Sequence, residues 1–245
     1  MVAILNLSPT FQIVQEERRV FELEVEMRVE ELWQAALSTM SSRLFNGPIF
    51  CATDYNEREI RGYFSEYRYL MAQIMDPRLK TVLNMKPVSL LGFLTCRDGV
   101  LFGRRQSWVA TRPGQWGFLP SGLLRPDLFA NQGKVDYVKA FLIHLKEELN
   151  MEAHFLSDLS VHSLVVDKAV EGENLSLVMR ADIALSSLSV KKEHLNAPDD
   201  EYDDVIAVPP EGLNAFLSDK SNRDMGIAGA LLARESYLSL ESDCA

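Results

Sequence analysis

The most regular hydrophobic pattern in the chain lies between Val138 and Leu149 and has the period of an α-helix. Its apolar residues fall on one side of a helical wheel: Val138, Phe141, Leu142, Leu145 and Leu149. His144, Glu147 and Glu148 lie together on a neighbouring flank, because residues three and four apart face each other on a helix. Asn150 follows the last apolar residue and can adopt the left-handed conformation that ends a helix. The pattern predicts a helix that is buried along one stripe and presents a histidine and two carboxylates at one place.

Earlier in the chain, alternating apolar and polar residues predict strands. In Val20 to Val29 the odd-numbered positions from 21 onward are apolar and the even-numbered ones from 22 onward are charged, which predicts a half-buried strand. Glu30 to Met40 has helical spacing and predicts a helix. Ile49 to Thr53 and Ile60 to Phe64 predict two further strands.

A hairpin is predicted just before the middle of the chain. Val88 to Leu94 and Val100 to Arg105 are apolar runs on either side of Arg97-Asp98-Gly99, and Asp-Gly is a favoured pair in tight turns. The polar stretch from Ser107 to Gln115 predicts a loop that leads into a short strand at Trp116.

The part of the chain after the helix predicts a second set of strands and two helices. Leu164 to Lys168, Leu175 to Leu185 and Val205 to Val208 have the composition of strands. Glu211 to Leu217 and Ala228 to Leu238 have helical spacing.

Composition and charge reduce the number of function classes that fit this chain. The chain has 245 residues, of which 47% are hydrophobic and 24% charged, as in an ordinary globular protein. It shows no apolar run of bilayer length, no signal-peptide pattern and no disulfide or zinc pattern among its three cysteines, so we expect a cytoplasmic protein that does not enter a membrane. The formal net charge of −10 argues against binding to a nucleic-acid backbone. A phosphorylated small molecule remains compatible, because a divalent cation can bridge carboxylates and phosphate oxygens.

The segment from Trp116 to Met151 resembles the Nudix box, GX5EX7REUXEEXGU, in which U is aliphatic. This box is the signature of hydrolases that cleave a nucleoside diphosphate linked to another group. Glu147 and Glu148 match its final pair of glutamates, and Pro120-Ser121-Gly122 is similar to the Pro-Gly-Gly turn at its start. The resemblance implies a Nudix-type α/β/α sandwich over residues 89–245.

The segment also departs from the box. Gly122 lies 25 residues before Glu147, seven more than in the motif, and the Arg-Glu step of the motif is replaced by Ile143-His144. At the position of the isolated glutamate of the motif, the only carboxylate nearby in the sequence is that of Asp127. Asn150 replaces a glycine of the motif. The box is therefore degenerate.

Residues 1–88 predict a small α/β extension without catalytic motifs. The run from Arg43 to Pro48, followed by Tyr67-Arg68-Tyr69, is similar to the leader of a two-part Nudix branch that includes enzymes acting on UDP-sugars. The similarity is loose, and it bears on the fold more than on the substrate.

The resemblance also implies a set of site residues. Glu147 and Glu148 would hold Mg²⁺ or Mn²⁺ with help from Glu201, and Asp200 is the next candidate in the same acidic run, which extends from Asp199 to Asp204. The other expected site residues are Gly122 at the turn and Arg104 or Arg105 at the diphosphate. A solvated strand end explains these arginines equally well, and a solvated loop explains the acidic run.

His144 has two interpretations. It could replace the missing glutamate in a catalytic group with Glu147 and Glu148, although imidazole suits softer ions than Mg²⁺. It could instead pair with Glu148 as a structural contact.

Two functions follow from these residues. The first is metal-dependent hydrolysis of a nucleotide sugar or a similar compound, supported by the retained pair of glutamates. The second is a catalytically inactive Nudix-fold module that binds a nucleotide or a protein partner, supported by the lost Arg-Glu step. A homodimer is compatible with either.

Overall fold

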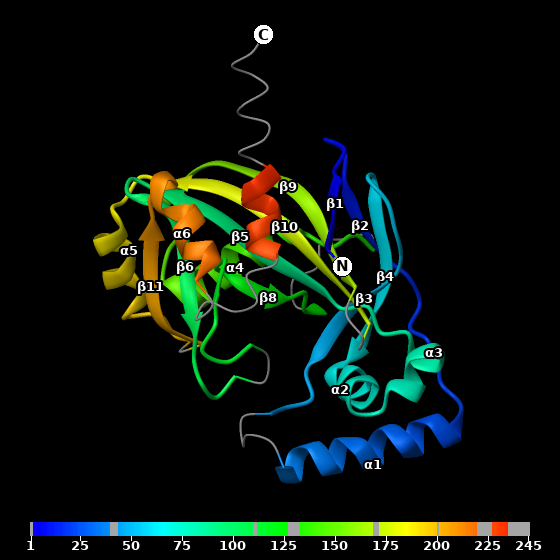
Figure 1. The fold of residues 1–245 in the computed structure, drawn as a ribbon. Coiled ribbons are helices and arrows are strands. Elements are labelled where there is room, and N and C mark those ends of the chain that lie inside the picture. Colours follow the sequence, from blue (N-terminus) through cyan, green and yellow to red (C-terminus); the bar gives the residue numbers. More distant parts are fainter. Residues whose placement is uncertain are drawn as a thin grey trace.

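The computed structural model describes residues 2–39, 44–109, 112–126, 133–168, 172–199, 201–219 and 227–234. Within them, eight strands form one mixed sheet (Figure 1). These strands are β1 (Val2–Asn6), β5 (Val88–Cys96), β6 (Gly99–Arg105), β7 (Trp116–Gly117), β8 (Ser121–Leu123), β9 (Leu156–Lys168), β10 (Glu173–Ile183) and β11 (Tyr202–Val208). Their order is β1-β9-β10-β5-β6-β11, with β7 beside β6 and β8 beside β5. The predicted hairpin is confirmed, because β5 and β6 pair at Thr95 and Val100.

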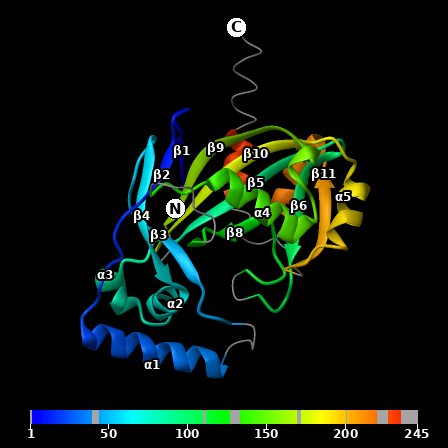
Figure 2. The same cartoon turned by 180° about the vertical axis from the view of Figure 1, so that it is seen from behind.

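Helices cover both faces of this sheet (Figures 1 and 2). On one face, α4 (Tyr137–Leu149) packs its Phe141 and Leu145 into a cluster that includes Leu90 and Leu101 of the sheet. On the other face, Phe102 packs in a second cluster with residues of α6 (Leu213–Ser218), which follows the 3₁₀ turn η4 (Pro210–Gly212), and of the helix at 227–234. Neighbouring residues such as Leu101 and Phe102 point to opposite faces, as strand geometry requires. The predicted α/β/α sandwich is confirmed.

A second sheet of three strands stands beside the sandwich. It has the order β2-β4-β3 and consists of β2 (Gln12–Gln15), β3 (Pro48–Tyr55) and β4 (Glu59–Glu66). Its helices are α1 (Leu23–Thr39), α2 (Tyr67–Met75), η1 (Pro77–Leu79) and α3 (Lys80–Leu83). β1, which precedes β2 in the chain, is not part of this sheet and pairs with β9 in the larger one. The division into units of residues 1–88 and 89–245 stays a prediction.

The prediction of a strand from Val20 to Val29 was wrong. Leu23–Thr39 is one helix, α1, which runs along one end of the molecule (Figure 1). Its buried side contains Val29, Leu32, Trp33 and Ala36, spaced as on a helix, whereas two members of the predicted strand face, Leu23 and Met27, are 75% and 66% exposed. The alternation was therefore produced by residues that do not share a face.

A further helix, α5 (Ser187–His194), lies between two of the predicted strands, where the sequence predicted no helix or strand. Ser186 begins it, because its side chain accepts a hydrogen bond from the backbone of Ser189. A short 3₁₀ turn, η3 (Ala153–Phe155), precedes β9. No helix among the described residues is long and apolar enough to cross a membrane. Met40, Arg43, Asp127, Asp200 and residues 235–238 lie outside the described residues.

Candidate functional site

α4 begins and ends where its sequence predicts. The side chain of Asp136 accepts a hydrogen bond of 2.9 Å from the backbone N–H of Lys139, which caps the start of the helix. Asn150 has φ 54° and ψ 27° and ends the helix in the predicted left-handed conformation. The buried stripe differs in part from the prediction, because His144 and Glu148 are buried in it and Val138 is 39% exposed. The helix therefore turns its polar flank toward the sheet.

His144 lies against β8. Its Nε2 donates a hydrogen bond of 3.3 Å to the carbonyl oxygen of Leu123, and its ring packs directly on Gly122. Its Nδ1 lies 3.6 Å from Glu147 and 3.7 Å from Glu148, which is longer than a good hydrogen bond. The structure thus brings His144 to both glutamates.

Glu148 is the most deeply buried carboxylate of the predicted site, with 2% of its surface exposed. The backbone N–H of Ser121 donates a hydrogen bond of 2.9 Å to its Oε2. Burial raises the pKa of Glu148 well above its ordinary value, and the negative charges of Glu201 and Asp199 raise it further, against the effect of the Ser121 N–H. Glu148 therefore ties the first residue of β8 to α4, and its neutral form is favoured.

Glu147 and Glu201 each pair with an arginine. Arg125, which follows β8, lies 3.0 Å from Oε1 of Glu147. Arg105 at the end of β6 forms an ion pair with Glu201. Burial raises the pKa of Glu201 despite this arginine.

These contacts do not fit a bound divalent cation. One oxygen of each of the three predicted ligands, Glu147, Glu148 and Glu201, is engaged by a different partner. In the described ranges no group of three or more His, Cys, Asp or Glu side chains is placed to hold a metal ion. A cation of the Mg²⁺ class needs several oxygen ligands at about 2 Å, so it would have to draw the second oxygens of these carboxylates to one point or compete with their partners.

The two predicted arginines lie in different places. Arg104 pairs with Asp203 at 2.6 Å, and its guanidinium lies 5.6 Å from the centre of the Trp116 ring. Arg105 donates to the hydroxyl of Ser121 at 3.4 Å, and that hydroxyl shares a hydrogen bond of 2.9 Å with Tyr202. Of these two arginines, only Arg105 lines the pocket between the sheet and the helix at 227–234.

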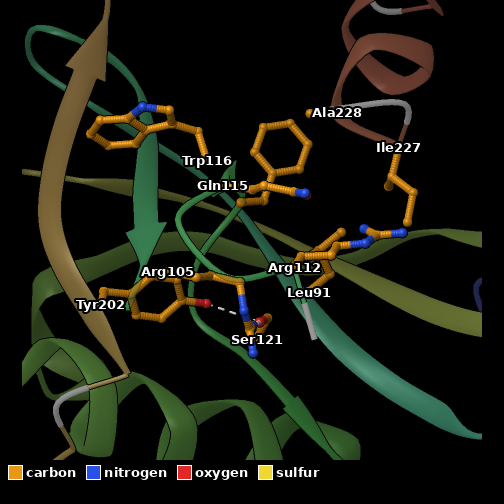
Figure 3. Close-up of a pocket in the computed structure, with 11 residues that line it drawn as sticks. Leu91, Arg105, Arg112, Gln115, Trp116, Ser121, Tyr202, Ile227 and Ala228 are labelled. Atoms are coloured by element: carbon orange, nitrogen blue, oxygen red, sulfur yellow. Dashed lines mark hydrogen bonds between the residues drawn. The ribbon is translucent and has the colours of Figure 1, made fainter. Parts of the chain in front are cut away.

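A pocket opens beside Arg105, between the sheet and the helix at 227–234 (Figure 3). It combines two guanidinium groups, an indole and polar side chains with apolar walls; its lining is Leu91, Arg105, Arg112, Gln115, Trp116, Gly117, Phe118, Ser121, Tyr202, Ile227 and Ala228. Arg112 also contacts Asp167 at 3.4 Å. Burial raises the pKa of Tyr202 well above its ordinary value, so its hydroxyl stays neutral.

Sequence reasoning missed three polar residues of this pocket, Arg112, Gln115 and Tyr202. Arg112 and Gln115 stood in a stretch predicted only as a loop, although both come just before the predicted strand at Trp116. Tyr202 stood within the acidic run. Its signal was its place directly before an apolar strand, where it pairs across the sheet with Arg105.

No protein-family model and no curated protein matches this chain. Among solved structures, it is similar to DR0079 of Deinococcus radiodurans, with 17% identity and a TM-score of 0.44 over 60% of this chain and 81% of that one. A C. elegans Ap4A hydrolase has 17% identity and a TM-score of 0.42 over 63% and 98% of the two chains. The NUDIX domain of Shewanella oneidensis NrtR, complexed with ADP ribose, has 15% identity and a TM-score of 0.41 over 61% and 87%.

These similarities do not assign a ligand or an activity to this chain, because the identities and TM-scores are low. The layered sheet and the helix between Gly122 and Met151 agree with the Nudix-type fold expected from the sequence. The function is inferred from the residues of the site.

Proposed function

We propose that this chain is a Nudix-type binding module that takes up a phosphorylated nucleotide or nucleotide sugar in the pocket of Arg105 and Arg112. The observation that carries the proposal is the contrast between two groups of residues. Glu147, Glu148 and Glu201 contact three different partners, whereas the guanidinium groups of Arg105 and Arg112, although each also contacts a carboxylate, line one pocket. Guanidinium groups bind phosphate through paired N–H donors.

The remaining walls of the pocket offer an apolar surface to a group attached to the phosphates. The indole of Trp116 offers a flat apolar surface, and Leu91, Phe118 and Ile227 add apolar contacts. Binding sites for small molecules typically combine such walls with a few fixed polar groups. The ligand would compete with Glu201 for Arg105 and with Asp167 for Arg112, so its phosphates replace carboxylates that are already there.

The second candidate is metal-dependent hydrolysis of the same class of compound. It is favoured by one observation, that carboxylate oxygens of Glu147 and Glu148 both lie within 3.7 Å of Nδ1 of His144. The adjacent carboxylates of the predicted box are thus present at one place. Mg²⁺ or Mn²⁺ as cofactor, a cytoplasmic location and a homodimer stay predictions from the sequence.

Calorimetric titration in EDTA tests the binding proposal. ADP-ribose, a UDP-sugar, a dinucleotide and a nucleoside triphosphate are titrated into the wild type, Arg105→Gln and the control Arg97→Gln, which changes an exposed arginine in the β5–β6 turn. We expect the wild type to bind at least one compound, Arg105→Gln to bind it about tenfold or more weakly, and Arg97→Gln to be unchanged. Absence of binding to the whole panel contradicts the proposal.

Hydrolysis is tested on the same compounds with Mg²⁺ or Mn²⁺. The double variant Ile143→Arg/His144→Glu rebuilds the missing step of the box beside Glu147, and Glu147→Gln removes one of the retained carboxylates. We expect no turnover by the wild type. Turnover that is abolished in Glu147→Gln would replace the binding proposal with the hydrolase, and a gain confined to the double variant would show that these two positions alone keep the site inactive.

A further inference from the structure

α1 presents large apolar side chains to solvent on the side that faces away from the rest of the molecule. Leu23 and Met27 are 75% and 66% exposed, and Leu37 near the end of the helix is 41% exposed. In Figures 1 and 2, α2 and α3 lie on one side of α1, and no described element covers the opposite side. A single exposed apolar residue is common on protein surfaces, whereas a row of them on one helix face marks a site for a partner.

The outer face of α1 has the spacing of a coiled-coil seam. Its exposed residues follow one another at alternating steps of four and three positions, and they are Leu23, Met27, Glu30, Gln34 and Leu37. Residues at these steps form one line along a helix and contact a second helix that lies beside it. The two polar members in the middle of the seam bond to each other, because the amide of Gln34 donates to Glu30 at 2.8 Å. With 17 residues, α1 is about 25 Å long, which is enough for two heptads of contact.

Glutamates flank this seam on both sides. Glu24 and Glu31 lie seven residues apart on one flank, and Glu26 lies on the other. Glu24 forms no ion pair with any residue that the structure describes, and Glu31 is 69% exposed. Arg28 does not offset this charge, because it pairs with Glu31 at 2.7 Å and with Asp76 at 3.1 Å. The flanks of the seam are therefore acidic.

This charge selects the kind of partner, because residues beside the seam of a coiled coil decide which helices pair. A second copy of α1 would bring Glu26 to Glu31 in a parallel pair, and Glu24 and Glu31 to the same glutamates in an antiparallel pair. An anionic membrane surface and a nucleic-acid backbone are repelled by the same carboxylates. A helix with lysine or arginine beside its apolar residues is attracted.

We infer that the outer face of α1 binds an amphipathic helix of a partner protein. The partner packs apolar side chains on Leu23, Met27 and Leu37, and it places lysine or arginine beside Glu24 and Glu31. This interaction does not rest on the proposed function, because no residue of α1 lines the pocket of the arginines.

The test uses two synthetic helical peptides of equal length with leucine at every seam position. All flanking positions are lysine in one peptide and glutamate in the other. The full chain is titrated into each labelled peptide at about 0.15 M salt, where long-range attraction is screened, and fluorescence anisotropy measures binding. We expect the wild type to bind the lysine peptide about tenfold or more tightly than the glutamate peptide.

Two double variants separate apolar contact from charge. Leu23→Ser/Met27→Ser keeps every charge and should bind the lysine peptide about tenfold more weakly. Glu24→Lys/Glu31→Lys keeps the apolar seam and should prefer the glutamate peptide. Leu188→Ser is the control, because Leu188 is 63% exposed on α5 and should not affect binding. All five substituted residues are exposed, and equal melting temperatures confirm that the variants fold.

Each other outcome overturns the inference. Absence of binding to the lysine peptide would do so, as would equal binding of both peptides. Binding that is unchanged in Leu23→Ser/Met27→Ser would reflect only general attraction to an acidic protein. Sedimentation of the chain alone and binding to phosphatidylserine vesicles examine the other occupants. Dimers or vesicle binding that are lost in Leu23→Ser/Met27→Ser would assign this face to a second copy or to a membrane.

Discussion

A Cβ atom on Gly122 would lie 2.5 Å from each ring nitrogen of His144. Real Cβ atoms do not approach other atoms so closely, so this glycine is required by the imidazole above it. The ring cannot easily move away, because it is buried on α4 and hydrogen-bonded to the carbonyl oxygen of Leu123. Gly122 and His144 thus set how closely β8 and α4 approach each other.

Gly122→Ala is expected to destabilise the protein. The added methyl group must displace a packed ring, and overpacking of this kind costs about 1–3 kcal/mol. In a protein of this size, each kcal/mol lowers the melting temperature by about 2–4 °C. Differential scanning calorimetry measures the change, and Gly117→Ala is the control, because a Cβ on Gly117 meets nothing within 4 Å.

Removing the ring should relieve the clash. The double variant Gly122→Ala/His144→Ala should lose less stability than the sum of the two single variants, since the alanine methyl then enters the space left by the imidazole. Additive losses would contradict the packing of His144 on Gly122.

The sequence predicted the parts of this region that depend on local order. The start and end of α4 follow from its spacing and from Asn150, and the contact of His144 with both glutamates follows from their three- and four-residue spacing. Arg125 and Gln115 were not found, because their roles depend on loops that fold back onto α4 and β6. Such contacts between distant segments leave no periodic signal in a single sequence.

The strand wrongly predicted at Val20 to Val29 shows a related limit. A run of alternating residues fits a strand, but the same run contains Val25 and Val29, which continue at helical spacing into Leu32 and Trp33. The partner for that longer stripe is α2, which lies more than 30 residues further along the chain. Burial against α2 therefore decided between two patterns that were both present.

Glu148→Gln should make stability less dependent on pH. The raised pKa of Glu148 means that the folded protein holds this proton more tightly than the unfolded chain. Its stabilising effect is complete below the ordinary glutamate pKa of about 4.5 and is lost as pH rises through the raised value. Glutamine keeps an acceptor for the Ser121 N–H and has no proton to lose. The stability of the variant relative to the wild type should therefore increase from pH 5 to pH 8.

Urea denaturation across this range measures the difference in free energy of unfolding. Glu152→Gln is the control, because Glu152 is an exposed glutamate just beyond the same helix. Parallel curves for the wild type and Glu148→Gln would contradict the buried, proton-holding state of Glu148.

Arg125→Gln should increase the affinity for Mg²⁺. The guanidinium of Arg125 lies 3.0 Å from Oε1 of Glu147 and competes with a cation for that oxygen. Both side chains are about one third exposed, so the pair contributes at most about 1 kcal/mol, which limits the gain to about fivefold. Calorimetric titration with Mg²⁺ measures it, with Arg97→Gln as the control. Equal affinities would show that Arg125 does not restrict Glu147.

Cys51 should resist thiol reagents as long as the protein is folded. It lies in the middle of β3 with 1% of its surface exposed, and burial raises the pKa of its thiol to about 12. Both effects suppress the thiolate that reacts with a disulfide reagent. In a Cys96→Ser/Cys244→Ser background, we expect no labelling at pH 8 within the time a free thiol needs to react completely, and complete labelling in urea. Because labelling requires β3 to open, its rate in low urea should track the local opening of the three-stranded sheet. Rapid labelling of the folded protein would contradict the packing of β3 beneath α1 and α2.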